Sequence, residues 1–327
     1  MKAAVARRYG PPDVVALVEV PLPPLRPGQV HVEVGAAAVT VGDARIRAAR
    51  APAGMGLLMR LAFGLTRPRR PVLGMMFAGR MASAGTRFND GDRVIGSTGM
   101  AMGAHAEILA VDESRLLPLS DLSDSDAVAL LFGGMTAADF LIDKARLRAG
   151  QRLLVNGATG EVGVAALQIA RHLGAVTTAV CRAENHALAR SLGAAACHDY
   201  RIGPPCGEWD AILDIAGTLP WARARALLAP GGVLMPVTAS LGQMLGAALQ
   251  PRRGGRRITG ATTSDGPAAL ARVLDLARAG VLVPVIAARL PLSGIAKAHA
   301  LVDSGHKRGS VVVVVTDQAT ETAMAAK

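Results

Sequence analysis

The chain has 327 residues, of which 51% are hydrophobic, 3% aromatic and 19% charged, and its formal net charge is +11. This length predicts about two domains, and so apolar a chain can bury a large core, which excludes global disorder. Three cysteines are too few for a disulfide framework or for a four-cysteine zinc site.

The basic excess raises nucleic acid or a smaller anionic ligand as a partner. Arg contributes 31 of the 36 basic residues, which are spread along the chain with local clusters at residues 67–70 and 252–257. Nucleic-acid binders usually concentrate such charge on one face and add aromatic rings for stacking, whereas this chain has only two Trp, two Tyr and five Phe. We therefore expect an arginine-rich surface and no nucleic-acid partner.

The sequence predicts neither a signal peptide nor a membrane span. The N-terminal residues reach charges and prolines before an apolar core of signal-peptide length. The longest uncharged run, residues 226–251, could span a bilayer by length, but Pro230, Pro236 and several glycines interrupt it. This run predicts a helix end, a turn, a buried strand and a loop. We expect a cytoplasmic protein without a membrane partner.

The first 120 residues are typical of β-structure. Residues 29–34 alternate between apolar and polar side chains, as a half-buried strand does, and further strands are predicted at residues 92–97 and 104–111. Between them, the apolar residues 54–64 predict a short helix or a lid. The apolar residues 55–65 could line a cleft, or they could pack in the core or in a dimer.

From residue 121 apolar strands and helices alternate, which predicts an α/β fold with a doubly wound parallel sheet. Ser123 or Asp124 could cap a helix that runs towards residue 148. Strands are then predicted at residues 152–156, 176–180, 211–215, 233–237 and 257–261, and helices at residues 161–173, 184–192, 219–228 and 267–279. The tail adds a helix at residues 293–303 and a strand at residues 310–315.

A glycine motif at the start of this region indicates a dinucleotide site. Gly157, Gly160 and Gly163 are spaced by three, between a predicted strand and the helix after it. In such a site the first glycine permits the tight turn, the second lets a pyrophosphate approach the backbone, and the third lets helix and strand pack closely. The N–H groups of the helix N-terminus then bind the anion.

The end of the next strand indicates which cofactor binds. A site for NADH usually has Asp or Glu here to bond the ribose 2′-hydroxyl, whereas this chain has Cys181 and Arg182. Arg182 could accept a 2′-phosphate, joined by Tyr200 and Arg201 at the following strand end, or it could be one more surface arginine. We favour NADPH over NADH.

Motifs along the whole chain extend this interpretation. They are the segment from Thr40 to Arg47, the turn from Pro71 to Gly79, Gly91-Asp-Arg-Val94, Gly133-Gly-Met-Thr-Ala137, the stretch from Gly150 to Arg171, Leu192-Gly-Ala194 with Asp199 and Tyr200, and Gly305-His-Lys-Arg-Gly309. Together they resemble the zinc-independent quinone oxidoreductase (zeta-crystallin-like) group of the medium-chain dehydrogenase/reductase superfamily.

The resemblance implies a GroES-like, β-rich catalytic domain split over residues 1–121 and 281–327. A Rossmann dinucleotide-binding domain at residues 122–280 would be inserted between the two pieces, with the active site in the cleft. The resemblance also implies transfer of hydride from NADPH to a quinone, an enone or a similar conjugated carbonyl, and it implies a homodimer.

Carried over residue by residue, the resemblance places Thr136 at the nicotinamide ribose, Arg182 at the adenosine end, and His306 in a tail that closes on the cofactor. As alternatives, Thr136 could cap a helix turn, Tyr200 could be a core-edge ring and His306 an ordinary surface imidazole. The implied cofactor-binding residues are Thr136, Gly157, Ala158, Thr159, Gly160, Glu161, Val162, Gly163, Cys181, Arg182, Tyr200, Gly217, His306 and Arg308.

Three features depart from the superfamily. Zinc-dependent relatives have ligands at the positions of Thr40, Met75, Met76 and Phe132, and none of these side chains suits zinc, so we expect no metal. Thr40 and Arg45 replace the family's Asn and Tyr and are the implied catalytic residues. Arg45 could donate to a developing oxyanion, or it could pair with Asp43 or Glu107.

Glu161 replaces the family's glycine. A carboxylate here stabilises the helix N-terminus but would repel a pyrophosphate if it pointed inward, so we expect it to point outward to solvent.

Conjugated acceptors suit a site without a Lewis acid, because hydride can add to the β-carbon while modest donors stabilise the enolate. The alternatives among enzymes are an alcohol dehydrogenase-like activity and an enoyl reductase. An alternative of another class is a non-catalytic NADPH-binding or RNA-binding protein, which the basic excess and the crystallin-like scaffold allow.

Overall fold

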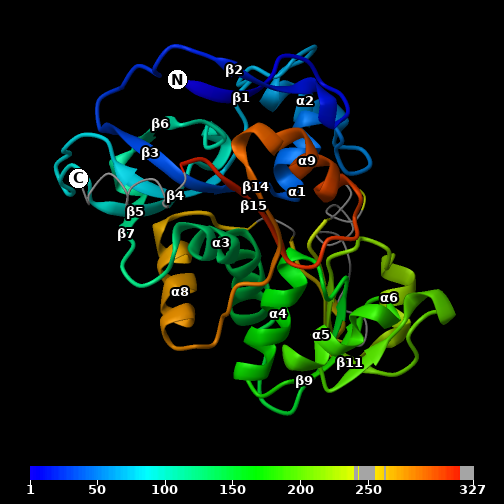
Figure 1. Cartoon of the computed structure of the whole chain (residues 1–327). Helices are drawn as coiled ribbons and strands as arrows, with labels where there is room; N and C mark the ends of the chain where they lie inside the picture. Colours follow the sequence, from blue (N-terminus) through cyan, green and yellow to red (C-terminus); the bar gives the residue numbers. More distant parts are fainter. Residues whose placement is uncertain (239–241, 243–254, 261–262, 317–327) are drawn as a thin grey trace.

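The computed structural model describes residues 1–238, 242, 255–260 and 263–316. These residues form a β-rich part, which contains both the N-terminal third and the tail, and a parallel-sheet part made by the middle of the chain (Figure 1). Helix α3, Asp124–Ala138, lies where the two parts meet, and it contacts β3, β4 and β15 on one side and α4 and α8 on the other.

The β-rich part contains a seven-stranded sheet in the order β14-β15-β3-β4-β5-β7, with β6 paired to β3, and a separate β1-β2 hairpin. Strand β15 pairs antiparallel with β3, Val312 opposite Ala38, so the tail completes a sheet begun by the N-terminal third. This pairing is consistent with a split domain, whose boundaries at 121/122 and 280/281 stay a prediction. The strands are β1 Lys2–Ala6, β2 Val15–Glu19, β3 Gln29–Ala38, β4 Met76–Met81, β5 Arg93–Ser97, β6 Ile108–Asp112, β7 Leu116–Pro118, β14 Ile286–Pro291 and β15 Ser310–Val314.

Three helices accompany this sheet: α1 Val41–Arg47, α2 Gly56–Phe63 and α9 Ile295–Asp303. Helices α1 and α9 pack on each other over a core that includes Val39, Ile46 and Ile295. Helix α2 has no buried residue: Met59 and Phe63 pack against this core, whereas Leu57 and Leu58 on its outer side are 70% and 60% exposed.

The parallel-sheet part has the strand order β10-β9-β8-β11-β12-β13, and all of its pairs are parallel. The order reverses between β8 and β11, and ligands bind at such a switch point in open α/β sheets. The strands are β8 Arg152–Asn156, β9 Val176–Val180, β10 Ala196–His198, β11 Trp209–Asp214, β12 Leu228–Pro236 and β13 Arg257–Ile258, and the helices are α4 Glu161–His172, α5 His186–Ser191, α6 Trp221–Leu227 and α8 Pro267–Arg278.

Alternation along the strands gives this sheet two buried faces. Leu153 and Val155 of β8 pack in the core shared with α3, α4 and α8, while Leu154 between them packs with α6 on the opposite face. Both faces are covered, which is why the strands read as continuous apolar runs in the sequence. The sequence thus predicts the fold class correctly.

Helix α3 begins at the predicted cap, where the Ser123 side chain accepts a hydrogen bond from the Asp126 backbone N–H. It continues into a π-helical turn, Asp139–Lys144. Among the described residues, Asp124–Lys144 is the one helical stretch long and apolar enough to cross a membrane, and 72% of its apolar window is buried inside the protein. Its position between the two sheets accounts for its composition.

The predicted strands and helices of the parallel-sheet part lie within a few residues of the observed ones, except that β12 begins five residues earlier, at Leu228. Of the uncharged run 226–251, residues 226–236 form the predicted helix end and strand, but β12 follows α6 directly at Leu228 without the predicted turn. Residues 239–241 and 243–251 lie outside the described residues, as do Arg252 and Arg253. Strands β1, β2, β4, β7, β10 and β14 and helix α1 are not predicted, and β6 begins at Ile108 rather than at residue 104. Edge strand β14 is missed because its half-exposed residues, which include Arg289, lack an apolar run.

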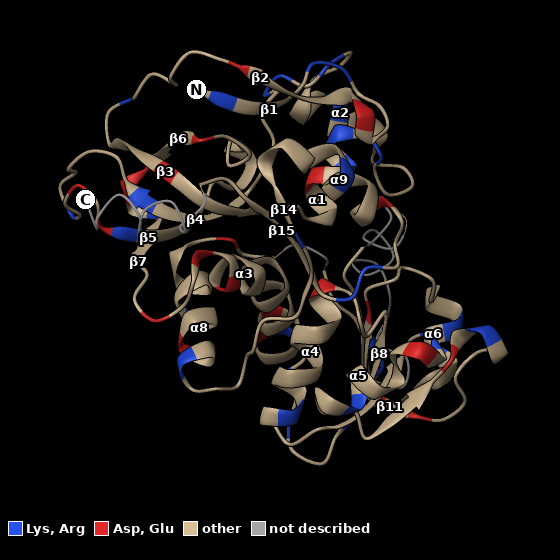
Figure 2. Ribbon diagram, viewed as in Figure 1, with Lys and Arg blue, Asp and Glu red and all other residues tan. Residues whose placement is uncertain are grey.

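Figure 2 shows basic and acidic residues interspersed over both parts of the molecule. Many arginines have carboxylate partners, such as Arg93 with Asp124 at 2.7 Å and Arg289 with Asp126 at 2.7 Å. These two pairs connect the sheet of the β-rich part to the start of α3. Part of the basic excess is therefore used in structural ion pairs.

Candidate active site

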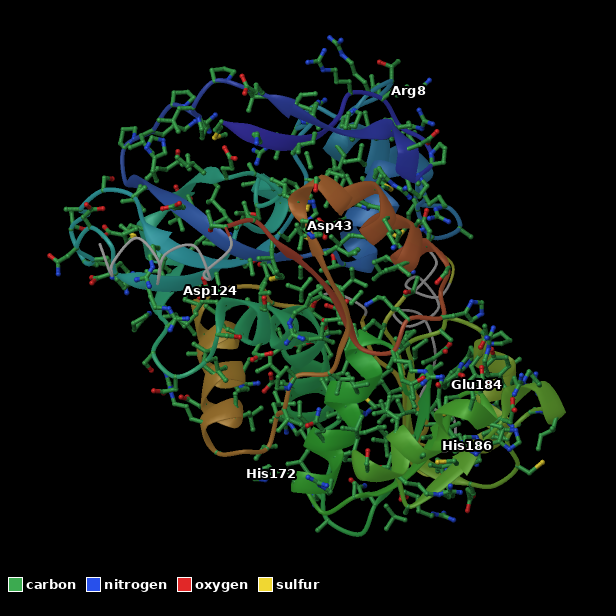
Figure 3. The ribbon with its side chains drawn as sticks, in the orientation of Figure 1. Arg8, Asp43, Asp124, His172, Glu184 and His186 are labelled. Carbon is green, nitrogen blue, oxygen red and sulfur yellow. The ribbon has the colours of Figure 1, made fainter. Side chains whose placement is uncertain are left out.

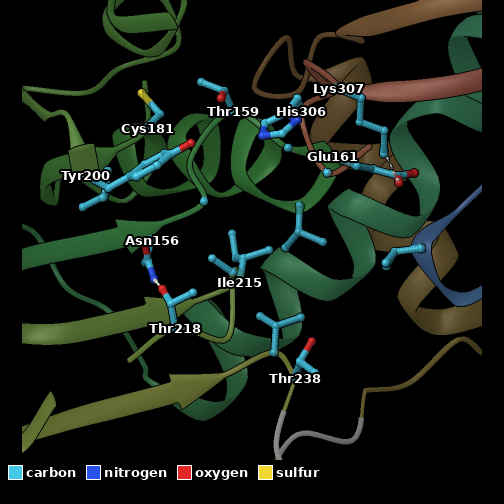
Figure 4. A pocket seen from close by; sticks show the side chains of 18 of the residues that line it. Asn156, Thr159, Glu161, Cys181, Tyr200, Ile215, Thr218, Thr238, His306 and Lys307 are labelled. Atoms are coloured by element: carbon cyan, nitrogen blue, oxygen red, sulfur yellow. Dashed lines mark hydrogen bonds and ion pairs between the residues drawn. The ribbon is translucent and has the colours of Figure 1, made fainter. Parts of the chain in front are cut away.

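A cavity of about 1000 Å³ lies at the carboxyl ends of the parallel strands, with walls from both parts of the molecule (Figure 4). The parallel-sheet part contributes the loop after β8 and the ends of β9, β11 and β12, and the β-rich part contributes α1 and the loop before β15. The candidate residues that line the cavity are Arg45, Thr136, Gly157, Thr159, Gly160, Glu161, Val162, Cys181, Arg182, Tyr200, His306 and Arg308.

The glycine loop has the geometry that a pyrophosphate requires. Gly157 has a φ of +87°, which a side chain would strain. A Cβ at Gly163 would overlap the Gly157 carbonyl oxygen and come within 2.5 Å of the Ala158 carbonyl, so helix α4 packs directly on the loop. A Cβ at Gly160 would meet only the Gly157 oxygen, at 3.7 Å, and Gly160 lines the cavity. The protein itself therefore leaves room at Gly160 for a ligand.

Polar side chains at the ends of neighbouring strands organise the floor of the cavity. Asn156 at the end of β8 donates to Asp214 Oδ1 (2.7 Å) at the end of β11 and to Thr218 Oγ1 (2.8 Å). The fully buried Asp214 also accepts from the backbone N–H groups of Gly217 (2.9 Å) and Leu219 (3.0 Å). The sequence reasoning missed this set, although polar residues at the ends of two adjacent parallel strands were a usable signal.

Arg182 and Tyr200 lie together at one end of the cavity, where Arg182 Nε donates to the Tyr200 hydroxyl at 2.9 Å. Glu184 lies beside them, 3.5 Å from Arg182, on the rim of the parallel-sheet part (Figure 3). Arg201 points its guanidinium at Asp199 (2.7 Å) and is not among the cavity-lining residues. Burial raises the pKa of the Cys181 thiol to about 11, so this cavity-lining sulfur stays protonated and is a poor nucleophile.

Arg45 reaches across the cavity from α1 and donates to Thr238 Oγ1, just after β12, at 3.1 Å. The expected ion pair with Asp43 or Glu107 is wrong. Asp43 lies within the β-rich part (Figure 3), where its carboxylate accepts from the N–H groups of Thr40 and Gly74, and Glu107 accepts from the N–H of Lys2. Burial and the nearby Arg50 lower the pKa of Arg45; its guanidinium remains a cation.

Thr40 does not reach the cavity. Its hydroxyl caps α1 in a reciprocal capping box with Asp43, and the residue is 0% exposed. This placement corrects the expectation of a catalytic Thr40, because a fully buried side chain cannot touch a substrate. Of the other candidates, Ala158 and Gly163 are buried and Gly217 is exposed, and none of the three lines the cavity; nor does any of residues 55–65.

Glu161 is the clearest departure from expectation. Its side chain does not point to solvent: the residue is 6% exposed and lines the cavity, and its Oε2 accepts from Lys307 Nζ at 2.9 Å. Burial raises the pKa of Glu161, and the Lys307 ammonium opposes that rise. Figure 4 shows the two side chains meeting at the end of the cavity away from Tyr200.

The described residues do not provide a zinc site. No group of three or more His, Cys, Asp or Glu side chains in the described part of the chain is arranged to hold a metal ion. Thr40 is engaged with Asp43, and the fully buried His105 binds the Ala38 carbonyl at 3.0 Å. The donor set near α1 therefore does not fit zinc.

Known dehydrogenases and oxidoreductases are similar in sequence to this chain. Residues 192–313 match the family described as zinc-binding dehydrogenase. The chain is 30% identical over 268 residues to the quinone oxidoreductase of Pseudomonas aeruginosa, which covers 74% of this chain and 81% of that protein. It is 28% identical over 329 residues to the chloroplastic NADPH-dependent alkenal/one oxidoreductase of Arabidopsis thaliana, which covers 96% of this chain and 79% of that protein.

The fold of the chain is also similar to that of solved oxidoreductase structures. The structure of the quinone oxidoreductase from Coxiella burnetii superposes with a TM-score of 0.85 at 26% identity, covering 97% of this chain and 99% of that one. The chain therefore belongs to the medium-chain dehydrogenase/reductase superfamily, and within it to the quinone oxidoreductase-like group, as the sequence motifs predicted. The chain also matches segments of two much longer curated synthases, spanning 4% and 9% of their length.

Proposed function

We propose that this protein is an NADPH-dependent, zinc-independent oxidoreductase that reduces a quinone, an enone or a similar conjugated carbonyl. The observation that carries the proposal is the cavity itself. It joins a glycine loop with space at Gly160, an arginine–tyrosine pair at one end, and Arg45 with Thr238 at the other. The relatives named for quinone and alkenal/one reduction support the acceptor class.

The residues present fit NADPH. The N–H groups in the first turn of α4 have no partner within the helix and would hold the pyrophosphate at Gly160. Arg182 and Tyr200 would hold the 2′-phosphate, and Thr136 the nicotinamide ribose. His306 and Arg308 would close on the cofactor from the tail. The cofactor, when bound, supplies the hydride.

At the acceptor end the chain offers hydrogen-bond donors in place of a metal. Negative charge develops on the carbonyl oxygen when hydride adds to the conjugated β-carbon, and donors already in position stabilise it. Arg45 is the cation placed to do so, because its guanidinium lines the cavity and is anchored on Thr238. The apolar Phe132, Ile215 and Val237 nearby favour an acceptor with an apolar body.

The test is NADPH oxidation by the purified protein with 1,4-quinones and α,β-unsaturated ketones. We expect turnover with these acceptors, tighter binding of NADPH than of NADH, and no stoichiometric zinc by metal analysis. A clear preference for NADH, or one zinc per chain, contradicts the corresponding part of the proposal. No turnover with any acceptor, together with salt-sensitive RNA binding, would favour a non-catalytic protein instead.

A second candidate is an enoyl reductase that acts on an acyl thioester. The matches to synthase segments favour it, since one of those proteins is named as a polyketide synthase system protein. An enoyl thioester in the same assay separates the two candidates by the ratio of kcat/KM values. The homodimer remains an expectation from the resemblance, and the cytoplasmic location remains an expectation from the sequence.

A further inference from the structure

Glu161 places a carboxylate where the proposed function needs an anion to bind. It is the first residue of α4, directly after Gly160, and the N–H groups of this helix end are those that would hold a pyrophosphate. Its Oε1 is buried and has no hydrogen-bond partner among the described residues, and its backbone carbonyl packs against Gly133 of α3. An uncompensated carboxylate in this position would repel NADPH.

Lys307 supplies the missing positive charge from a distant part of the sequence. Its ammonium lies 2.9 Å from Glu161 Oε2 and donates to the Gly309 carbonyl at 2.8 Å, and the two paired side chains are only 10% and 4% exposed. The same tail loop is attached to the glycine loop by the backbone, since the Gly309 N–H donates to the Thr159 carbonyl at 2.9 Å. Gly309 has no space for a side chain, because a Cβ would overlap the Val285 carbonyl.

We propose that Lys307 is the counter-ion that makes the glycine loop compatible with an anionic cofactor despite Glu161. The pair takes the place of the glycine that the family usually has at this position. It also positions the tail loop, residues 305–309, over the cofactor site, so that Lys307 is a positioning residue for NADPH binding. The inference rests on the proposed function, because it concerns the same site.

The physical argument is charge balance in a partly desolvated site. Together Glu161 and Lys307 are neutral, so the pyrophosphate meets the helix N-terminus and not a net negative charge. The other groups that face Glu161 do not provide this balance: Asp43 adds negative charge, and the Ser310 hydroxyl is uncharged. Removing Lys307 therefore leaves a buried carboxylate whose charge is unpaired.

A double-mutant cycle tests the pair through the dissociation constant of NADPH, measured by fluorescence titration without an acceptor. We expect Lys307→Met to weaken NADPH at least tenfold at pH 8, Glu161→Gln to change it less than threefold, and the double variant to return close to wild type. Arg308→Met is the matched control, because it removes a charge from the same cavity-lining loop. We expect Glu161→Gln not to restore the affinity that Arg308→Met loses.

The pH profile separates a charge effect from a merely structural one. Loss of Lys307 raises the pKa of Glu161 further, so in Lys307→Met we expect NADPH to bind progressively more tightly as pH falls and Glu161 takes up a proton. Wild type and the double variant should show no such trend. The 2′-phosphate of NADPH has a second pKa of about 6, so its own protonation does not produce such a trend above pH 7.

Additive losses, or a Lys307→Met variant whose affinity does not change with pH, would overturn the inference. Melting temperatures of the cofactor-free variants show whether each one folds, and the rescued double variant keeps the test decisive if Lys307→Met is unstable. Failure of the proposed function looks different, because wild type itself would then not bind NADPH.

Discussion

The two walls of the cavity are built in different ways. The wall from the parallel-sheet part contains a segment built mainly from backbone: the glycine loop and the first turn of α4 follow one another within residues 156–163. The wall from the β-rich part is made of charged side chains, Arg45 and Lys307, that meet partners far away in the sequence, Thr238 and Glu161. The glycine loop therefore depends on neighbours along the chain, whereas the contacts of Arg45 and Lys307 depend on residues that only the fold brings close.

The largest effect is expected where the backbone wall has no space. Gly163→Ala forces a Cβ against the backbone carbonyls of Gly157 and Ala158, and we expect a loss of about 2–3 kcal/mol of stability together with loss of NADPH binding. Gly160→Ala is the matched control, because its Cβ meets nothing closer than 3.7 Å. It should cost less than about 1 kcal/mol of stability.

Thermal unfolding and NADPH titration of the two variants check this difference. Gly160→Ala should fold normally and still weaken NADPH at least tenfold, since its methyl group enters the space facing the cavity. Equal stability of the two variants would show that α4 does not pack on the loop as closely as the structure indicates. Unchanged NADPH affinity in Gly160→Ala would show that the pyrophosphate does not bind at this loop.

An intermediate effect on NADPH affinity is expected at the end of the cavity where the adenosine part of the cofactor would bind. Arg182→Ala should weaken NADPH by roughly 10–100-fold, because charge-assisted hydrogen bonds to a phosphate contribute about 1.5–3 kcal/mol, and it should leave NADH nearly unchanged. Arg201→Ala is the control, since Arg201 pairs with Asp199 and does not line the cavity. Comparable losses of NADPH and NADH in Arg182→Ala would mean that Arg182 does not read the 2′-phosphate.

The smallest effect is expected on the pH dependence of stability, and it comes from a buried histidine of the β-rich part. His299 of α9 is fully buried, its ring 5.8 Å from that of His105, and burial together with His105 and Arg47 lowers its pKa to about 2. The unfolded chain takes up a proton here below its ordinary pKa of 6.5, whereas the folded protein does not. His299 therefore reduces stability progressively as pH falls below 6.5.

The non-titrating variant His299→Leu should remove this contribution. We expect its melting temperature to fall by a few degrees less than that of wild type between pH 7 and pH 5, as measured by calorimetry. Comparing each variant with itself at the two pH values cancels any change in packing. Parallel curves for the two proteins would show that His299 does not stay neutral in the fold.

Local sequence was sufficient where neighbours in the chain decide the structure. The strands β8 and β9 match the predicted ranges residue for residue, and the cap at Ser123 and the turn at Gly157 follow from side-chain and backbone chemistry within a few residues. Prediction was poorer for β4 and β14, whose residues are held as strands by partners elsewhere in the sheet. Arg80 in β4, and Arg289 and Pro291 in β14, interrupt the residue pattern by which a strand is recognised in a sequence.

The sequence by itself determined the family, the α/β fold and the glycine loop, because periodicity and turn chemistry act over short distances along the chain. Only the tertiary structure decided what the polar and charged residues of the candidate site do. Thr40 is a helix cap, Arg45 bonds to Thr238 and Glu161 turns inward to Lys307, since packing brings together groups 146 or more residues apart in the last two cases. The energy of a buried charge depends on such partners, and no local pattern in the chain records them.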